Sequence, residues 1–262
     1  RGYGNLVSNF AEYWSTSKFD YIFALGDRFE MSAAVQATIA FNLKIAHLHG
    51  GETTIGAIDN IYRHQITLAS KLHFVSSSVF AEKVFNLTGN KENIYSVGSL
   101  SIDGLENLSL PKWSTVMDKF NIPNKKFVLV TFHPETVNVN KNNQYSEIVF
   151  ESLLKISNTY HVIITMANAD TMGSLYREVS KKLKENNKNK FTLVEGFGKE
   201  NYFAAMKECQ FLIGNTSSGI LEAASFQKYV INVGSRQLGR LQSGNVINVE
   251  FNKTQILEAV EK

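Results

Sequence analysis

The sequence has few of the features that identify exported or membrane-spanning proteins. Of its 262 residues only Cys209 is a cysteine, which excludes an internal disulfide. No apolar run approaches the roughly 18 to 20 residues needed to cross a bilayer, and the chain does not open with a basic segment followed by an apolar one. These absences predict a soluble protein of the reducing cytoplasm, with no membrane partner.

The net charge of the chain is also small. Its 27 lysines and arginines stand against 24 aspartates and glutamates, a formal net charge of +3 at pH 7. The densest run of lysines, residues 181–190, is interleaved with asparagine and glutamate, which is typical of a solvated helix end rather than of a nucleic-acid surface. We therefore expect no nucleic-acid partner, while the sequence leaves a homo-oligomer open.

Hydrophobic residues make up 44% of the sequence, and many stand in short runs rich in β-branched residues. Between most of these runs, apolar residues recur every three or four positions, as in a helix with one apolar face. One such stretch has its face at Ile58, Ile61, Tyr62, Gln65, Ala69 and Leu72. Alternating strands and helices predict an α/β fold with parallel sheets covered on both faces. The expected strands are Tyr21–Leu25, Ile45–Leu48, His73–Ser76, Ile94–Val97, Phe127–Phe132, His161–Met166, Phe191–Val194, Phe211–Ile213, Tyr229–Val233 and Val246–Val249.

The alternation pauses between Ser99 and Asn124, where two prolines bracket a short helical piece at 113–120. A domain boundary is expected in this interval, and no repeat of solenoid period is visible. The predicted layout is an N-terminal domain of residues 1–110 and a C-terminal, nucleotide-binding domain of residues 111–262, with a cleft between them.

Polar clusters that directly follow expected strands are the candidates for a ligand site, because loops and helix N-termini converge at the carboxyl ends of parallel strands. The first cluster, Gly26–Glu30, contains Asp27 and Arg28. Asp27 fits an N-cap that accepts backbone N–H bonds. It also fits, together with Arg28, a group that binds sugar hydroxyls and moves protons.

The second cluster combines His49 and Glu52 with Asp59 and Arg63, which lie on the next expected helix. The glycine pair between His49 and Glu52 lets the backbone approach a ligand closely. Asp59 and Arg63 are four residues apart on one helix face, so one interpretation is a surface ion pair worth a few tenths of a kcal/mol. The histidine spacing matches no familiar zinc motif, and no metal is expected.

Two further clusters follow strands in the second half of the chain. His133 precedes a proline at a strand end, a rigid position that suits a general acid, a phosphate contact or a structural cap of its own loop. Residues 214–219, GNTSSG, form a strand-to-helix turn that suits an anion, although a Ser-capped helix without a ligand fits equally well. Glu222 follows, where it can accept hydrogen bonds from a ribose diol. No Walker lysine is present, so the turn is not a P-loop.

Taken in this order, the clusters resemble the hydrolysing UDP-N-acetylglucosamine 2-epimerases of bacterial sialic acid biosynthesis. The matching stretches are GDRFE from Gly26, HLHGGE from His47 with IYRH from Ile61, HPET from His133, NAD from Asn168, GNTSSG from Gly214 with Glu222, and VGSRQLGR from Val233. The resemblance implies two Rossmann-like domains of the B-type glycosyltransferase kind, with the active site in the cleft. Against that pattern, the first strands and phosphate loop of the N-terminal domain are missing, which leaves that domain incomplete.

The resemblance also implies roles for single residues. Asp27 matches a strand-end aspartate implicated in catalysis, whereas Glu52 and Asp59 match an acidic segment that handles the C2 proton of the sugar. His133 matches a histidine near the leaving phosphate. His49 stands where many members carry glutamate, so the identity of the base stays open among the three carboxylates and this histidine. The implied substrate-binding residues are Arg28, Arg63, Asn168, Gly214, Asn215, Ser217, Ser218, Gly219, Glu222, Arg236, Gln237 and Arg240.

The implied reaction removes the C2 proton while the nucleotide leaves from C1, and then hydrates the 2-acetamidoglycal from the opposite face. It converts a UDP-sugar, UDP-N-acetylglucosamine, to N-acetylmannosamine and UDP. It needs no cofactor, nicotinamide included, in keeping with the lack of a GxGxxG sequence. The alternatives are a retaining glycosyltransferase of the same fold and an inactive nucleotide-sugar-binding module. Diacetamido-trideoxy sugars and GDP forms stay open as substrates.

Overall fold

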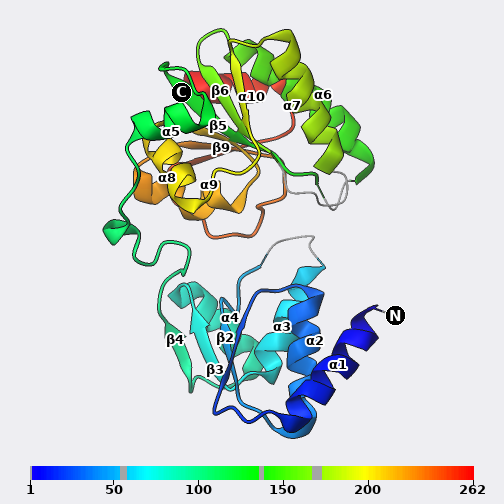
Figure 1. The fold of residues 1–262 in the computed structure, drawn as a ribbon. Coiled ribbons are helices and arrows are strands. Elements are labelled where there is room, and N and C mark those ends of the chain that lie inside the picture. Colours follow the sequence, from blue (N-terminus) through cyan, green and yellow to red (C-terminus); the bar gives the residue numbers. More distant parts are fainter. Residues whose placement is uncertain (1, 54–57, 136–138, 167–172) are drawn as a thin grey trace. The chain divides into compact units, whose positions relative to one another are not determined.

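The chain folds into two compact units, each built on its own parallel sheet. The computed structural model describes residues 2–53, 58–135, 139–166 and 173–262. The two units are Arg1–Asp103 and Gly104–Lys262 (Figure 1). Their parallel sheets and alternating helices confirm the predicted α/β class. In the described part of the chain, no helix is long and apolar enough to cross a membrane.

The first unit contains a four-stranded parallel sheet in the order β1-β2-β3-β4, so each strand lies beside the next one in the chain. The predicted strands are all present, and their ends differ from the observed ones by at most one residue. The elements are α1 (Gly2–Thr16), β1 (Ile22–Leu25), α2 (Phe29–Thr38), η1 (Ile39–Phe41), β2 (Ile45–Leu48), α3 (Asp59–Ala69), β3 (Leu72–Val75), α4 (Ser78–Thr88) and β4 (Ile94–Ser96).

Helices α2, α3 and α4 cover one face of this sheet. Ala24 and Ile45 of the first two strands pack with Val35 of α2 and Ile66 of α3 in a buried cluster. A second cluster joins Val75 of β3 to α4. Successive residues of a strand point to opposite faces of the sheet. The residues that pack on the helices therefore alternate with residues that point to the other face.

The opposite face of the first sheet presents an aromatic row, formed by Phe23, Phe74 and Tyr95. The ring centroids of Phe23 and Phe74 lie 6.3 Å apart, and those of Phe74 and Tyr95 lie 5.6 Å apart. Phe23 is 65% exposed and Tyr95 is 47% exposed. The expected cover on both faces is therefore wrong for this sheet in the described residues.

The apolar face predicted for the helix at α3 is also wrong in part. Ile58 is 67% exposed and Ile61 is 59% exposed, whereas α3 buries Arg63, Ile66 and Thr67. Two of the three buried residues are polar: Arg63 bonds to Asp27 in the loop after β1, and Thr67 bonds to His47 of β2. A pattern of apolar residues alone therefore misplaces the inward face of α3.

The second unit contains a six-stranded parallel sheet in the order β10-β9-β8-β5-β6-β7. This is the Rossmann strand order, in which the chain starts in the middle, winds to one edge and then returns to the other. The elements are η2 (Leu105–Asn107), α5 (Trp113–Phe120), β5 (Phe127–Thr131), η3 (Val139–Lys141), α6 (Asn142–Ile156), β6 (His161–Thr165), α7 (Gly173–Asn186), β7 (Phe191–Val194), α8 (Lys199–Glu208), β8 (Leu212–Gly214), α9 (Ser217–Leu221), η4 (Ala223–Phe226), β9 (Val230–Val233), β10 (Val246–Val249) and α10 (Lys253–Glu261).

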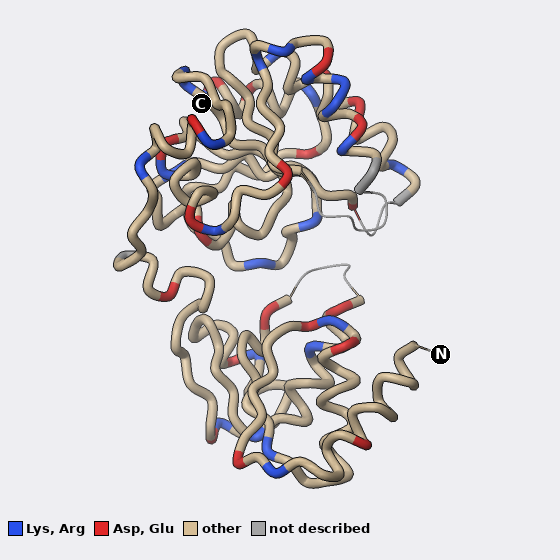
Figure 2. The backbone as a smooth tube through the Cα atoms, in the orientation of Figure 1, with Lys and Arg blue, Asp and Glu red and all other residues tan. Residues whose placement is uncertain are grey.

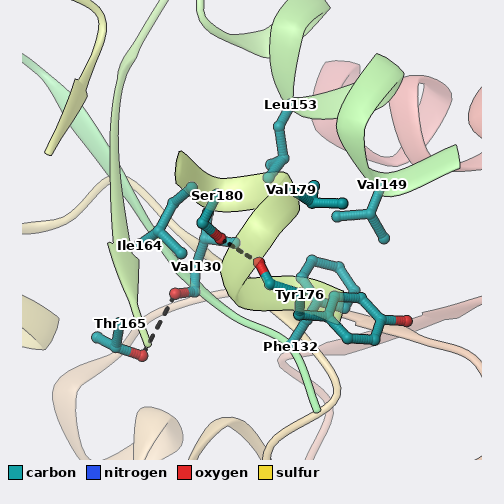
Figure 3. Close-up of a pocket in the computed structure, with 9 residues that line it drawn as sticks. All are labelled: Val130, Phe132, Val149, Leu153, Ile164, Thr165, Tyr176, Val179 and Ser180. Atoms are coloured by element: carbon teal, nitrogen blue, oxygen red, sulfur yellow. Dashed lines mark hydrogen bonds between the residues drawn. The ribbon is translucent and has the colours of Figure 1, made fainter. Parts of the chain in front are cut away.

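Both faces of the second sheet are covered by helices. Figure 1 shows α6, α7 and α10 on one side and α5, α8 and α9 on the other. A cavity of about 10 Å³ lies between β5, β6 and the first of these layers, lined in part by Phe132 and Tyr176 (Figure 3). Because this volume is at the lower limit for a single water, the cavity is a packing gap and not a ligand site.

Strand order reverses between β5 and β8, and the two strands approach very closely at their carboxyl ends. Gly214 ends β8 with φ +152°, and a Cβ at this position would lie 1.8 Å from the carbonyl oxygen of Thr131. The amide of Asn215 donates to that same carbonyl at 3.1 Å. Only glycine fits here, because any side chain would enter the backbone of β5.

We expect Gly214→Ala to destabilise the second unit by about 2 to 4 kcal/mol, because the new methyl group must push β8 away from β5. Urea unfolding followed by the fluorescence of Trp113, which stacks on Phe127, measures this unit in a Trp14→Phe background. Gly244→Ala is the control, since no atom lies within 4 Å of its added Cβ. Equal unfolding midpoints for the two variants would contradict this account of the β5–β8 contact.

Candidate functional site

The first-unit candidates gather where β1 and β2 end and α3 begins. We call Asp27, His49, Glu52, Asp59 and Arg63 the carboxylate cluster. Figure 2 shows acidic and basic residues close together at this end of the first unit. Arg63 is only 6% exposed, and its guanidinium donates to the Asp27 carboxylate and to the backbone carbonyl of Glu52.

This arrangement does not support the N-cap interpretation of Asp27. The N-cap of α2 is Arg28, whose side chain forms no capping hydrogen bond within the described residues. Asp27 instead forms the ion pair of the buried Arg63, which without a partner would be strongly destabilising. The expected surface pair between Asp59 and Arg63 is therefore replaced by a link from α3 to the end of β1.

His49 and Glu52 form a hydrogen-bonded pair. His49 has a left-handed backbone, φ +64°, and its Nδ1 lies 2.6 Å from Glu52 Oε1. The Leu100 amide donates to His49 Nε2 at 3.3 Å, so Nδ1 carries the proton that bonds to Glu52. Burial disfavours the Glu52 carboxylate, but the hydrogen bonds from His49 and Ser76 outweigh it and lower the pKa of Glu52.

Asp59 has the opposite character. Burial first, and the negative charge of Asp27 second, raise the pKa of Asp59 above its ordinary value. One carboxyl of the cluster is thus stabilised in its charged form and another is shifted toward its protonated form. A pair of acids whose pKa values are pushed apart is the arrangement that separates a base from an acid.

Arg28, in contrast to the buried Arg63, has an exposed side chain. Its guanidinium lies 3.3 Å from Glu30 and its side chain is 67% exposed. Among the described residues, no group of three or more His, Cys, Asp or Glu side chains has an arrangement that would hold a metal ion.

The second-unit candidates lie where the strand order reverses. The side chain of Asn215, which is fully buried, accepts from the His133 amide at 2.7 Å and donates to the His133 carbonyl at 2.8 Å. Gln237, also buried, donates to the carbonyl of Asn215 at 2.7 Å. The structure therefore makes Asn215 and Gln237 backbone clamps that fix the position of His133.

The GNTSSG turn leads into α9, which is only five residues long. Thr216 is its N-cap, and the Ser218 hydroxyl donates to the Tyr202 hydroxyl at 3.2 Å. Gly219 packs so tightly that an added Cβ would lie 2.9 Å from Val230. Glu222 falls at the C-cap of α9, where the helix gives way to η4. Ser217, in the first turn of α9, is partly exposed.

An open pocket lies beside this turn, along the carboxyl ends of β5 to β8. We call it the strand-end pocket. Its volume is about 320 Å³. The sequence does not predict most of the residues that line this pocket, because their only shared sequence feature is that they follow strands. The lining residues are Thr131, Thr165, Val194, Glu195, Phe197, Gly198, Lys199, Tyr202, Thr216 and Ser218.

The basic stretch after β9 contacts the segment that follows β5. Arg236 donates from its guanidinium to the Pro134 carbonyl at 3.0 Å, and Arg240 is partly buried three residues beyond Gln237. Glu135, which the sequence did not single out, anchors this stretch through its carboxylate. Asn168 lies outside the described residues.

Comparison with known proteins gives one family. A family model described as UDP-N-acetylglucosamine 2-epimerase matches residues 1–262. The chain is 33% identical over 246 residues to a GDP/UDP-N,N'-diacetylbacillosamine 2-epimerase (hydrolyzing) of Campylobacter jejuni, with 94% of this chain and 64% of the relative aligned. It is 32% identical over 255 residues to polysialic acid biosynthesis protein P7 of Escherichia coli, covering 97% of this chain and 64% of that protein.

Solved structures agree in fold. A UDP-GlcNAc 2-epimerase from Neisseria meningitidis bound to UDP-GlcNAc matches with a TM-score of 0.82 and 16% identity over 99% of this chain and 72% of that one. The S. aureus MnaA–UDP structure matches with a TM-score of 0.81 and 19% identity, covering 99% and 69%. Similarity at this level shows a shared fold, and it confirms the expected B-type glycosyltransferase class of Rossmann-like units.

The chain spans 64% of the length of the Campylobacter and Escherichia relatives. Its family is nevertheless shown twice, by the model that matches its whole length and by a hydrolysing 2-epimerase of Legionella pneumophila that is 33% identical and covered over 68% of its length. This chain belongs to the UDP-N-acetylglucosamine 2-epimerase family.

Proposed function

We propose that the protein is a hydrolysing 2-epimerase that cleaves a UDP-N-acetylhexosamine, with UDP-N-acetylglucosamine as the leading substrate, and releases UDP and the free 2-epimerised sugar. The observation that carries the proposal is the buried Arg63, which donates to the Asp27 carboxylate and to the Glu52 backbone carbonyl and so gathers carboxyl groups at one strand-end site. The names of two relatives, both hydrolysing 2-epimerases of diacetylbacillosamine nucleotides, support the reaction type.

The second unit binds the nucleotide in this proposal. Its strand-end pocket lies at the topological switch point, the position where Rossmann-like sheets bind nucleotides. Phe197 and Tyr202 supply an apolar wall, while Ser218 and Lys199 supply donors for phosphate oxygens. His133, held by Asn215, adds a donor beside the turn. Glu222 accepts hydrogen bonds from the ribose diol.

The carboxylate cluster carries out the chemistry on the sugar. A base takes the C2 proton as the C1–oxygen bond to the diphosphate breaks, which gives UDP and a 2-acetamidoglycal. Water then adds to C1 while a proton returns to C2 from the opposite face. The first step needs a group that accepts the proton from C2, and the second needs a group that donates a proton to C2 from the opposite face.

In this proposal the tasks are divided among the residues of the cluster. Glu52, whose pKa is lowered, orients His49 through the hydrogen bond to its Nδ1. Asp27, which forms an ion pair with Arg63, is the second candidate base. Asp59, whose pKa is raised, is the group best suited to return a proton. In this scheme, loss of the Glu52 charge disables His49 without touching the nucleotide.

We expect Glu222→Ala to weaken UDP binding about tenfold, because hydrogen bonds to a charged group contribute about 1.5 to 3 kcal/mol. Titration calorimetry with UDP and with 2′-deoxy-UDP measures the effect. The native chain should prefer UDP, whereas the variant should bind both equally. Glu208→Ala, an exposed carboxylate on α8, is the control. A preference for UDP that survives in Glu222→Ala would reject the ribose assignment.

We expect Glu52→Gln to lower turnover of UDP-N-acetylglucosamine about 100-fold or more in the complete protein, because the base loses its orienting charge. Affinity for UDP should stay within about twofold, the pattern of a group that acts only in the transition state. Glu92→Gln, an exposed carboxylate of the same unit, is the matched control.

Turnover in deuterated water tests the mechanism itself. Proton and mass spectra of the released sugar should show one deuterium at C2, since the returning proton comes from solvent through the enzyme. A free 2-epimerised sugar without deuterium at C2 would rule out the route through a glycal.

A further inference from the structure

We propose that Glu135 is a positioning residue that sets the affinity for the diphosphate of the nucleotide by anchoring the turn that carries Arg236. The inference rests on the proposed nucleotide site of the second unit. Glu135 touches no substrate in this proposal and acts through the backbone that it holds.

The Glu135 carboxylate is buried and satisfied by a neighbouring turn. It is 3% exposed, and its Oε1 accepts from the backbone amides of Ser235 and Arg236, both at 3.2 Å. Its Oε2 accepts from the Ser235 hydroxyl at 3.3 Å. Among the residues that the structure describes, no cation forms an ion pair with it. Oriented amides of a tight turn therefore stabilise this buried charge.

Aromatic rings lie close to the turn that the carboxylate holds. Gly234, with φ +84°, lets the turn approach: an added Cβ would lie 2.8 Å from Glu135 Oε1 and 2.3 Å from the Phe251 ring. Tyr176 packs its ring on Phe132, and burial first and the Glu135 charge second raise the pKa of the Tyr176 phenol. In such a medium a charge-assisted hydrogen bond is stronger than at the surface.

The backbone beneath Glu135 is fixed as firmly as its side chain. The buried side chain of Asn142 accepts from the Glu135 amide at 2.9 Å and donates to the Glu135 carbonyl at 3.0 Å. Asn215 holds His133 in the same manner two residues earlier. The segment from His133 to Glu135 is thus a rigid base from which the carboxylate reaches the turn.

The hydrogen bonds between the turn and the segment after β5 form a closed network. From the anchored turn, Arg236 donates back to Pro134, and Gln237 donates to the carbonyl of Asn215. This hydrogen-bond network therefore connects Glu135 through the turn to Asn215 and, through Asn215, to His133. Loss of the Glu135 charge would loosen the turn and Asn215 together, and with them the donors expected to face the diphosphate.

The position of the charge argues against direct contact with substrate. An exposed carboxylate beside a diphosphate would repel it. Buried and neutralised by N–H groups, Glu135 keeps its charge away from the phosphate oxygens while it orders the basic turn. An acid that follows a strand beside an anion site, as Glu135 does in this proposal, is consistent with the role of ordering the basic turn.

Glu135→Gln tests the inference, because the amide keeps the shape and offers an oxygen to the two N–H groups and an NH2 to the Ser235 hydroxyl. We expect UDP to bind about 3 to 10 times more weakly, since a neutral hydrogen bond has roughly half the strength of a charge-assisted one. Uridine, which lacks phosphate, should bind within about twofold of its affinity for the native chain. Glu147→Gln, an exposed carboxylate on α6, is the control for both ligands.

A double-mutant cycle with Arg236→Ala completes the test. If Glu135 acts through the turn, the Glu135→Gln effect on UDP affinity should shrink to less than about twofold once Arg236 is removed. Equal losses for UDP and uridine, or a loss of UDP affinity that is undiminished in the Arg236→Ala background, would overturn the inference. So would native UDP affinity in Glu135→Gln. A native chain that binds neither ligand would instead reject the proposed nucleotide site along with the inference.

Discussion

The contact between Gly214 and the Thr131 carbonyl governs the architecture of the second unit. Because β8 meets β5 without a side chain between them, the two halves of the sheet join tightly at the point where the strand order reverses. That closeness lets Asn215 reach both backbone groups of His133. A bulkier strand end would move the turn and the histidine apart, so the site is a consequence of sheet geometry.

In the first unit the organising element is a buried cation. Arg63 enters the protein from α3 and ties the end of β1 to the loop after β2. Burying a guanidinium is favourable only with good partners, and Asp27 and the Glu52 carbonyl supply them. The same charge lowers the energy of nearby carboxylates, so the packing of α3 and the chemistry of the cluster depend on one residue.

The strands and their boundaries could be predicted from the sequence, because buried parallel strands read as continuous β-branched runs such as Phe127–Thr131. The positions of Asp27, His49 and His133 just after strands could be predicted as well, and the rule that ligands gather at carboxyl ends of strands makes these residues candidates for a site. The inward face of α3 could not be predicted, since it is set by the polar Arg63 and Thr67 and not by apolar spacing.

Contacts that depend on the order of the strands in the sheet could not be predicted from the sequence either. Glu135 and Ser235 are a hundred residues apart, and nothing in their local sequence signals the contact that β5, β8 and β9 create. The wall of the strand-end pocket has the same origin: Thr165 ends β6, Phe197 lies between β7 and α8, and Ser218 lies in α9. Periodicity finds elements, whereas the order in which strands associate decides which loops meet.

The aromatic row of the first sheet has a practical consequence for handling the protein. The rings of this row, those of Phe23, Phe74 and Tyr95, stack across neighbouring strands. They form a hydrophobic surface, and none of the three residues is charged. Surfaces of this kind adsorb hydrophobic dyes and detergents and promote self-association as concentration rises. Replacing the most exposed ring, Phe23, with a polar β-former such as threonine would improve the solubility of preparations while leaving the carboxyl-end loops in place.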